Sequence, residues 1–423
     1  MPVSHRPLLI CDLTQSYAPT GGGGVGTYLR EKQRHIIERT GHRLLQIVPG
    51  EVDRVVENGR HIWVEVGAGQ VRGSPNYRFI MRTGAVRAVL ERYQPDIIES
   101  LCPWVLPWTA IHYARAHPET ALVAGYHTDF PNVHVHRVAS AMFGPRLGLA
   151  LKQVSVAYAH YTYRFFDRLY ALNHPVKAQL GEWGIHHVSV LPLGVDTARF
   201  NPALRDPALR ARMGLAAPDF PDHGPLLVYA GRIDNEKRAD RLIEMFRHLP
   251  PEMGAGLVLF GDGKLRERLI EETRGLPIAL PGFVDDREDL ARALASGDIY
   301  VSAMADETFG ISVIEAQASG LPVVGVASGA MPARVPSGLG LLGPVDDVAA
   351  MAANVQAVWA RGAQGMGAAA RAHVLSRFSW ERTFNQLIGD VYPAAMARAA
   401  QRQAGRFGWL GAPTPAVSHR ALG

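Results

Sequence analysis

The chain has 423 residues, enough for two domains of about 200 residues each. Hydrophobic residues make up 47% and charged residues 20% of the chain, a balance that is ordinary for a soluble globular protein and argues against a disordered one. The net charge of +5 is uneven: residues 1–200 hold 21 of the 44 basic and 15 of the 39 acidic residues, a net +6, and the remainder carries −1.

The basic first half predicts an anionic partner, which a membrane phospholipid, a phosphorylated acceptor or nucleic acid would satisfy. An Arg-rich composition without functional meaning explains the same charge. Cys11 and Cys102 are too few for a disulfide framework and fit a reducing cytoplasm. No run of 18 apolar residues predicts a membrane span, and the first residues lack a secretory signal, so we expect a cytoplasmic protein.

Short apolar runs alternate with helical patterns along the first half of the chain. A helix is expected at 27–39. The segment 139–163 mixes apolar and basic residues, as a membrane-surface helix would. Core packing explains the apolar half of that pattern equally well. This β-α-β rhythm predicts a doubly wound parallel sheet. Its strands are expected at 8–12, 42–48, 96–99, 121–126 and 168–172.

The rhythm restarts after residues 201–225, whose Pro, Ala and Asp content is typical of a linker. Helices are expected at 240–249 and from 311. The α/β prediction is therefore two Rossmann-like domains, 1–200 and 201–392, facing each other across a cleft, with 393–423 as a C-terminal helix and flexible tail. The second set of strands is expected at 226–231, 257–261, 299–302 and 322–325.

The segment 307–315 carries the strongest local signal for chemistry. It places Glu307 and Glu315 eight residues apart around a Phe-Gly turn that leads into a helix. A helix N-terminus presents unpaired N–H groups to a phosphate, and the neighbouring acids can accept hydrogen bonds from sugar hydroxyls. The pattern suggests a nucleotide-sugar site; two solvated acids near a helix start are the alternative.

A glycine-rich stretch follows the first strand. Gly21, Gly23 and Gly26 match G-x-G-x-x-G, the fingerprint of a dinucleotide dehydrogenase. The preceding loop, 13–20, is too long for that fold, and no acid ends the second strand. The interpretation that remains is a loop whose glycines let backbone amides approach a phosphate closely. A flexible loop without this function is the alternative.

Three further side chains follow predicted strands and are expected at the same cleft. Arg232 and Lys237 are suited to clamping a diphosphate and neutralising a leaving nucleotide, or they belong to a solvated charged loop. His127 is suited to binding a sugar hydroxyl or moving a proton, or it is a half-buried structural histidine. His134 and His136 have H-x-H spacing, but no further ligands support a metal, so none is expected.

Together these segments resemble the family 4 glycosyltransferases, retaining enzymes of the GT-B fold, over residues 8–385. The region around His127 is similar to the branch that glycosylates membrane lipids and touches the bilayer with its N-terminal domain. One departure is Asp306, an extra acid beside Glu307, which leaves the donor sugar open. The matching residues are 22–24, His127, 192–196, Phe200, Gly231, Arg232, Glu236, Lys237, 260–263, 281–283 and 307–315.

The resemblance implies that 1–200 binds the acceptor and 201–392 the nucleotide-sugar donor, and it implies a role for each matching position. Arg232 and Lys237 would hold the diphosphate, Glu315 the ribose, and His127 would meet the donor sugar. The remaining donor contacts it implies are Glu307 with the amides of Phe309, Gly310 and Ile311 for the sugar, Phe283 and Val284 for the base, and Gly23 and Gly24 for the phosphates.

The implied reaction moves a hexose from a nucleoside-diphosphate sugar, of GDP-mannose or UDP-glucose type, to a hydroxyl acceptor, with a membrane lipid as one candidate. The resemblance favours front-face attack with retention. No cofactor and no metal are expected, since Arg232 and Lys237 supply positive charge. The expected location is cytoplasmic, with peripheral contact to the inner face of the membrane.

Two alternatives stay open. A GT-B sugar phosphorylase or a nucleotide-sugar epimerase shares the fold. A non-catalytic nucleotide- or nucleic-acid-binding protein is the other, although a basic half poor in aromatic residues argues against a nucleic-acid partner.

Overall fold

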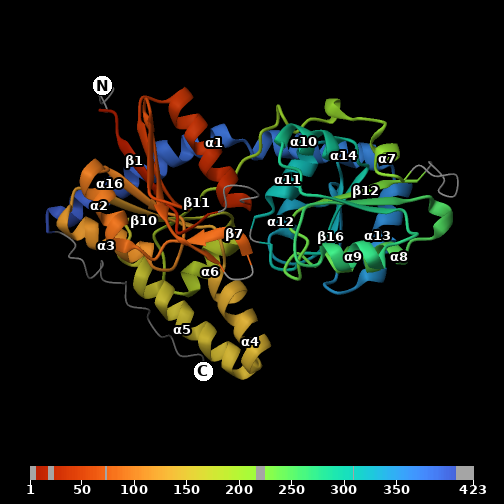
Figure 1. The fold of residues 1–423 in the computed structure, drawn as a ribbon, viewed down its shortest axis with the longest axis horizontal. Helices are drawn as coiled ribbons and strands as arrows, with labels where there is room; N and C mark the ends of the chain where they lie inside the picture. The colour runs from red at the N-terminus through yellow and green to blue at the C-terminus, as the bar shows by residue number, and fades with distance from the viewer. Residues whose placement is uncertain (1–5, 18–22, 72–73, 216–223, 308, 406–423) are drawn as a thin grey trace, which may run out of the picture. The chain divides into compact units, whose positions relative to one another are not determined.

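The computed structural model describes residues 6–17, 23–71, 74–215, 224–307 and 309–405. The chain forms two compact units, each with its own hydrophobic core. The first unit combines Met1–Leu191 with Phe384–Gly423, and the second unit is Pro192–Thr383. Each has a parallel sheet with helices on it (Figure 1). The predicted pair of Rossmann-like sheets is confirmed.

The first unit has an eight-stranded sheet in which only β4 runs antiparallel to its neighbour. Its central strands are buried along their whole length, which explains their continuous apolar sequences. In sheet order the strands are β11 (Val188–Val190), β10 (Arg168–Ala171), β9 (Ala121–Tyr126), β8 (Ile97–Ser100), β1 (Leu9–Leu13), β3 (Arg43–Gly50), β5 (His61–Gly67) and β4 (Arg54–Asn58). A small sheet joins β2 (Ser16–Tyr17), β7 (Ser74–Phe79) and β6 (Gly69–Val71).

Helices connect these strands, and two of them, α4 and α5, extend together from one end of the unit (Figure 1). The helices of the first unit are α1 (Gly23–Arg39), α2 (Thr83–Tyr93), α3 (Leu106–Ala116), η1 (Pro131–His136), α4 (Arg137–Phe143), α5 (Pro145–Tyr163), α6 (His174–Glu182), η4 (Leu387–Val391) and α16 (Tyr392–Gln403). No helix within the described residues is both long and apolar enough to cross a membrane.

The second unit has a six-stranded sheet in which every pairing is parallel. In order the strands are β14 (Ile278–Gly282), β13 (Gly256–Phe260), β12 (Leu226–Ala230), β15 (Ile299–Ser302), β16 (Val323–Val326) and β17 (Gly340–Gly343). Its helices are η2 (Pro202–Leu204), α7 (Leu209–Arg212), α8 (Ala239–Arg247), η3 (Pro251–Met253), α9 (Arg266–Glu272), α10 (Arg287–Ala295), α11 (Ile311–Ala318), α12 (Met331–Arg334), α13 (Val348–Ala360) and α14 (Ala363–Arg377); α15 (Trp380–Gln386) carries the chain back to the first unit.

The unit boundaries differ from the expected 200/201 and 392/393. Residues 201–215, expected as part of a linker, belong to the second unit because their polar side chains bind it. Arg205 donates to the carbonyl of Gly297, 2.9 Å away, and pairs with Asp298 at 2.7 Å. Arg210 donates to the carbonyl of Gly224 at 3.0 Å and to that of Gly254 at 3.3 Å. A Pro- and Ala-rich composition does not reveal such anchors.

The expected C-terminal helix is present as α16, but it is part of the first unit rather than a separate segment. It packs against β9 and β10 through buried Ala395 and Ala399. Arg402, near its end, pairs with the buried Asp167. The first unit is therefore built from two stretches of chain separated by the whole second unit. The expected tail beyond residue 405 lies outside the described residues.

Candidate functional site

The candidate donor residues of the second unit all follow the carboxyl ends of its parallel strands. Arg232 and Lys237 follow β12, Phe283 and Val284 follow β14, and Glu307 follows β15. Ligands of open α/β sheets bind at this edge. Sequence reasoning therefore placed these side chains at the edge where a ligand would bind.

Glu307 uses both carboxylate oxygens within the second unit. The Gly310 N–H donates to its Oε1 at 3.0 Å, and Lys237 Nζ lies 3.2 Å from its Oε2. Gly310 has φ +83°, a left-handed conformation that favours glycine, and it is the residue before α11. The structure thus brings together Lys237 and Glu307, from loops 70 positions apart in sequence.

The second acid of the pair, Glu315, lies on α11 and is 4% exposed. Arg287, at the start of α10, donates to Glu315 Oε1 and also lies over the ring of Phe200, 4.9 Å from its centre. Sequence reasoning missed Arg287, because nothing in the spacing of 287 and 315 indicates that α10 and α11 are neighbours. A ribose that binds Glu315 would share this carboxylate with Arg287.

Arg232 is half-exposed and already neutralised within its own loop. It pairs with Asp234 and, at 2.8 Å, with Glu236. Asp234 also accepts a hydrogen bond of 2.9 Å from the Lys237 backbone N–H, which holds the loop in a turn. A diphosphate at Arg232 would compete with these two acids.

The β12 and β13 loops approach each other so closely that glycine is required. A Cβ on Gly263 would lie 2.3 Å from the carbonyl oxygen of Ile233, and this glycine has φ +158°. Directly after β14, the strand next to β13, Phe283 is 51% exposed and Val284 is half-buried. An exposed aromatic ring at a ligand-binding edge suits stacking with a base.

In the first unit, His127 follows β9 and is 7% exposed. Burial lowers the pKa of its imidazole to about 4. The charge of Glu99 opposes this shift, and the charge of Lys32 acts in the same direction as burial. The ring is therefore neutral at pH 7. Its Nε2 lies 2.8 Å from the Tyr170 hydroxyl. Whether His127 meets a donor held by the second unit remains a prediction.

The Tyr170 hydroxyl determines which imidazole nitrogen of His127 carries the proton. It donates to Glu99 Oε1 at 2.8 Å. Burial alone would raise the pKa of Glu99, but the Lys32 charge and hydrogen bonds from Tyr392, Tyr28 and Lys32 hold it below its ordinary value. Because the ionised Glu99 only accepts, the Tyr170 proton is directed to it and His127 Nε2–H must donate to Tyr170. The lone pair of the neutral imidazole is then on Nδ1.

A buried polar cluster surrounds Glu99 and was not predicted. Lys32, Asp12 and Glu99 are each fully buried; Lys32 pairs with Asp12 and, at 2.9 Å, with Glu99. Burial raises the pKa of Asp12 to about 6 despite the neighbouring Lys32. Asp12 and Glu99 lie at the ends of apolar runs in predicted strands. Their burial depends on Lys32, a cation on the facing helix α1, and the strand patterns do not indicate that pairing.

The expected glycine loop differs from prediction because α1 begins at Gly23, so Gly23 and Gly24 form the first helical turn and Gly26 follows within the helix. Gly21 and Gly22 lie outside the described residues. The amides of a first turn have no partners within the helix, so a phosphate contact by Gly23 and Gly24 stays a prediction with a different backbone geometry.

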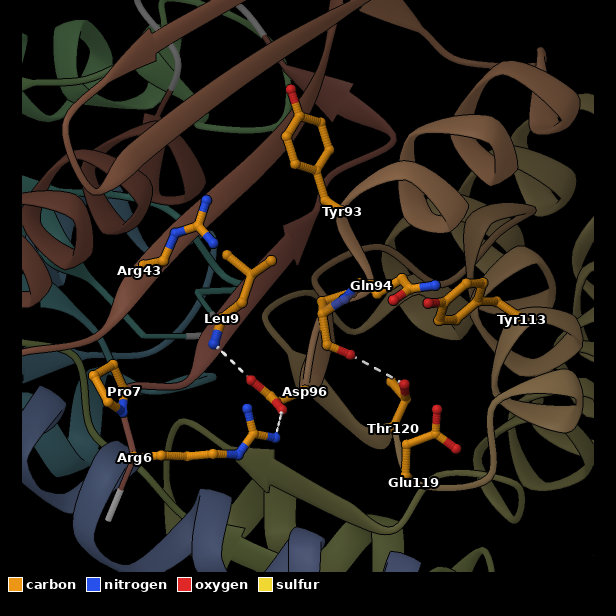
Figure 2. A pocket seen from close by; sticks show the side chains of 11 residues that line it. Arg6, Pro7, Leu9, Arg43, Tyr93, Gln94, Asp96, Tyr113, Glu119 and Thr120 are labelled. Carbon is orange, nitrogen blue, oxygen red and sulfur yellow. Dashed lines mark hydrogen bonds and ion pairs between the residues drawn. The ribbon is translucent and has the colours of Figure 1, made fainter. Parts of the chain in front are cut away.

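One pocket of about 340 Å³ lies at the opposite edge of the first sheet (Figure 2). Leu9 and Arg43 begin β1 and β3, while Asp96 and Thr120 stand just before β8 and β9, so this is the amino-end edge. Asp96 accepts from the Leu9 N–H at 2.8 Å and pairs with Arg6. None of the candidate donor residues lines it.

No three His, Cys, Asp or Glu side chains gather into a metal-binding group within the described ranges, His134 and His136 included. The expectation that the reaction needs neither metal nor cofactor stays a prediction.

Comparisons with known proteins agree with this architecture. Residues 22–199 match the model for Glycosyltransferase Family 4, and 224–361 match that for Glycosyl transferases group 1. The chain is 30% identical over 401 residues to a GDP-mannose-dependent alpha-mannosyltransferase of Mycobacterium tuberculosis, covering 93% of this chain and 98% of that protein. It is 31% identical over 287 residues to a GDP-mannose-dependent alpha-(1-6)-phosphatidylinositol dimannoside mannosyltransferase of the same species, covering 67% of this chain and 71% of that protein.

Solved structures share the fold. A sucrose-phosphate synthase of Thermosynechococcus elongatus has a TM-score of 0.74 at 20% identity, covering 93% of this chain and all of that one. Anabaena HepE, solved with UDP and glucose, has a TM-score of 0.67 at 17% identity, covering 91% and 99%. Since the first of the two mycobacterial relatives aligns along nearly its whole length, the chain belongs to the family 4 glycosyltransferases.

Proposed function

We propose that this glycosyltransferase moves mannose from GDP-mannose to a hydroxyl group of a membrane glycolipid, with retention of the anomeric configuration. The observation that carries the donor half is the Lys237–Glu307 pair, 3.2 Å apart, beside the N-terminus of α11. It combines a cation for a diphosphate, a carboxylate for sugar hydroxyls and a helix end for negative charge.

The base and the sugar are proposed from the relatives. Two mycobacterial relatives are named as GDP-mannose-dependent, and one of them acts on a phosphatidylinositol dimannoside. These relatives are transferases by name, which favours transfer over the phosphorylase, the epimerase and the non-catalytic binding protein.

The chemistry proposed for the site needs positioning and charge rather than a covalent intermediate. Arg232 and Lys237 would stabilise the charge that develops on the leaving GDP, while Glu307 holds the sugar and Glu315 the ribose. The neutral His127 would meet the donor sugar. The donor phosphate would take the proton of the acceptor hydroxyl.

A panel of nucleotide sugars tests the donor assignment. In a thermal-shift assay, a ligand present at 100 times its Kd stabilises the fold by about 2.7 kcal/mol. We expect the largest shift with GDP-mannose and smaller shifts with UDP- and ADP-sugars. A larger shift with a UDP-sugar would contradict the base, and no shift with any of them would contradict a nucleotide-sugar site.

The lipid half of the proposal is supported by the surface of α4 and α5. Residues 137–163 contain no Asp or Glu, and Arg146 is exposed. Leu147, Val154 and Tyr161 recur every seven residues, as side chains on one face of a helix do. Isolated exposed apolar residues are ordinary, but a contiguous group with basic neighbours suits an anionic membrane. The exposed large apolar side chains are Val138, Met142, Phe143, Leu147, Leu149, Val154 and Tyr161.

Liposome flotation tests this surface. The chain should float with vesicles containing anionic phospholipid, and salt should weaken that binding. The double variant Met142→Ser, Phe143→Ser should float less, whereas the control Val52→Ser, Val55→Ser, at exposed positions elsewhere in the first unit, should behave like the original chain. Equal flotation of both variants, or binding indifferent to salt, would contradict a membrane role for this surface.

A further inference from the structure

Arg334 is buried at the end of α12, next to the loop that we assign to the donor sugar. It is 4% exposed, and its Nε–H donates to the carbonyl oxygen of Phe309 at 2.7 Å. Its own carbonyl accepts from the Gln317 side chain on α11 at 2.8 Å. Arg334 therefore joins α12, the donor loop and α11.

Aromatic rings, rather than a carboxylate, hold this guanidinium among the described residues. Its Cζ lies 4.0 Å from the centre of the Phe309 ring and 4.7 Å from that of Phe378, and these two rings contact each other edge-to-face at 6.1 Å. Burial lowers the pKa of Arg334 to about 10, although the charge of Glu307 opposes this shift. The side chain is still a cation at neutral pH.

The peptide between Phe309 and Gly310 is fixed from both sides. Arg334 Nε–H binds its carbonyl, and Glu307 Oε1 accepts from its N–H at 3.0 Å. Because a peptide unit is planar, fixing both polar groups fixes its orientation. This peptide leads into Gly310, the residue directly before α11, so the path by which the loop enters the helix depends on it.

A second set of contacts supports the other end of the loop, at Glu307. The backbone N–H of Ala330 donates to the Glu307 carbonyl at 2.7 Å, just before α12. Gly329 packs so closely there that a Cβ would lie 2.6 Å from the same oxygen. The α12 region thus supports the loop at Glu307 and at Phe309.

The burial of Arg334 is not explained by stability. Its Nη2 has no hydrogen-bond partner among the described residues, which leave out Thr308. A buried charged donor left without a partner costs stability, and apolar replacements of buried ionic groups are often neutral or stabilising. A reason for keeping the arginine must come from what it orients.

We propose that Arg334 is a positioning residue for the donor sugar, acting through the Phe309–Gly310 peptide and Glu307. This inference rests on the proposed function, because it deepens the role of the same loop. Without the guanidinium, the peptide can rotate, and the sugar contacts move while the nucleotide contacts at Arg232, Lys237 and Glu315 remain.

The test compares Arg334→Met and Arg334→Lys with the original chain. The measurements are Tm, the Kd values for GDP and GDP-mannose by calorimetry, and kcat and KM for transfer. If the panel described above selects another nucleotide sugar, that sugar and its diphosphate replace this pair. For Arg334→Met we expect a Tm near the original, GDP affinity unchanged within about twofold, and kcat/KM lowered about 100-fold, the size of effect that a misplacement of about 1 Å causes.

Arg334→Lys should recover part of that loss, since an ammonium can bind the Phe309 carbonyl but, unlike a guanidinium, cannot stack on an aromatic ring. The matched control is Arg402→Met in the first unit, which removes a buried arginine paired with Asp167. It should lower Tm and leave the ratio of GDP to GDP-mannose affinities unchanged. If Arg334→Met does not fold, the ratio of GDP to GDP-mannose affinities in Arg334→Lys tests the proposal instead.

Two outcomes separate this inference from the function on which it rests. If the original chain binds a nucleotide sugar and the Arg334 variants keep its affinity ratio and its kcat/KM, Arg334 does not position the donor. If the original chain binds no nucleotide sugar, the proposed function fails and the inference fails with it.

Discussion

At the scale of single residues, Lys237 and Glu307 neutralise each other where a charged donor is expected to bind. Replacing Arg232, Lys237 or Glu307 by Ala should lower the transfer rate about 30- to 1000-fold, which corresponds to about 2–4 kcal/mol in the barrier. Initial-rate kinetics on folded variants measure this. The matched control is Lys177→Ala, an exposed lysine on α6 of the first unit. Full activity in all three variants would contradict the assigned roles.

His127 also predicts how stability depends on pH. Its pKa of about 4 in the fold lies below the ordinary value of 6.5, so the unfolded chain takes up a proton first as the pH falls. The contribution of His127 is present above pH 6.5 and is lost between pH 6.5 and 4, by an amount on the order of 3 kcal/mol. His187, with a pKa lowered to about 4 chiefly by burial, acts in the same direction. Asp12, whose pKa burial raises to about 6, acts in the opposite direction.

The measurement is urea unfolding of the original chain and of His127→Gln at several pH values. The difference in unfolding free energy between the two should shrink as the pH falls from 6.5 to 4. His187→Gln provides the comparison with a second buried histidine outside the candidate site. A difference that stays constant over this range would contradict a neutral, buried His127.

At the scale of elements, α16 completes the polar cluster of the first sheet. The Tyr392 hydroxyl donates to Glu99 Oε2 at 2.5 Å, and both residues are buried. Tyr392→Phe removes one hydrogen bond to a buried carboxylate and should lower the free energy of unfolding by about 1.5–3 kcal/mol. Urea unfolding measures it. Tyr161→Phe, at an exposed position on α5, should change it by less than about 0.5 kcal/mol. Equal effects of the two variants would show that the Tyr392 bond contributes nothing.

The helices and strands also show which structural features could be predicted from sequence patterns and which could not. The partly buried β5 and β14 were not predicted, whereas strands such as β9 and β12 were predictable because they are short, fully buried apolar runs. The site residues that follow them were predictable because strand ends converge on one edge of a sheet. Arg334 and Arg287 were not, since each reaches its partner through the packing of one helix against another. The start of α1 at Gly23 was missed because glycine has a low helix propensity.

At the scale of the whole molecule, the second unit is one continuous stretch with its own core, Pro192–Thr383. We expect this stretch, expressed alone, to fold and to bind GDP, because Arg232, Lys237, Phe283, Glu307 and Glu315 all lie within it. Circular dichroism and calorimetry would measure this. The stretch 1–191 alone should be unstable, because Glu99 and Asp167 would lose Tyr392 and Arg402. Joining 384–405 to it through a linker should restore folding; a stable 1–191 fragment would contradict the role of α16.

The split construction of the first unit also has a consequence for the order of synthesis. The ribosome makes β1 to β11 first, yet α16, which covers β9 and β10, comes only after the entire second unit. At about 5–20 residues per second, the roughly 200 intervening residues take about 10–40 s. The second unit can fold as soon as it emerges, whereas β9 and β10 wait without the helix that packs on them. During that interval the apolar surface that α16 later covers is exposed, a condition that favours aggregation of a nascent chain.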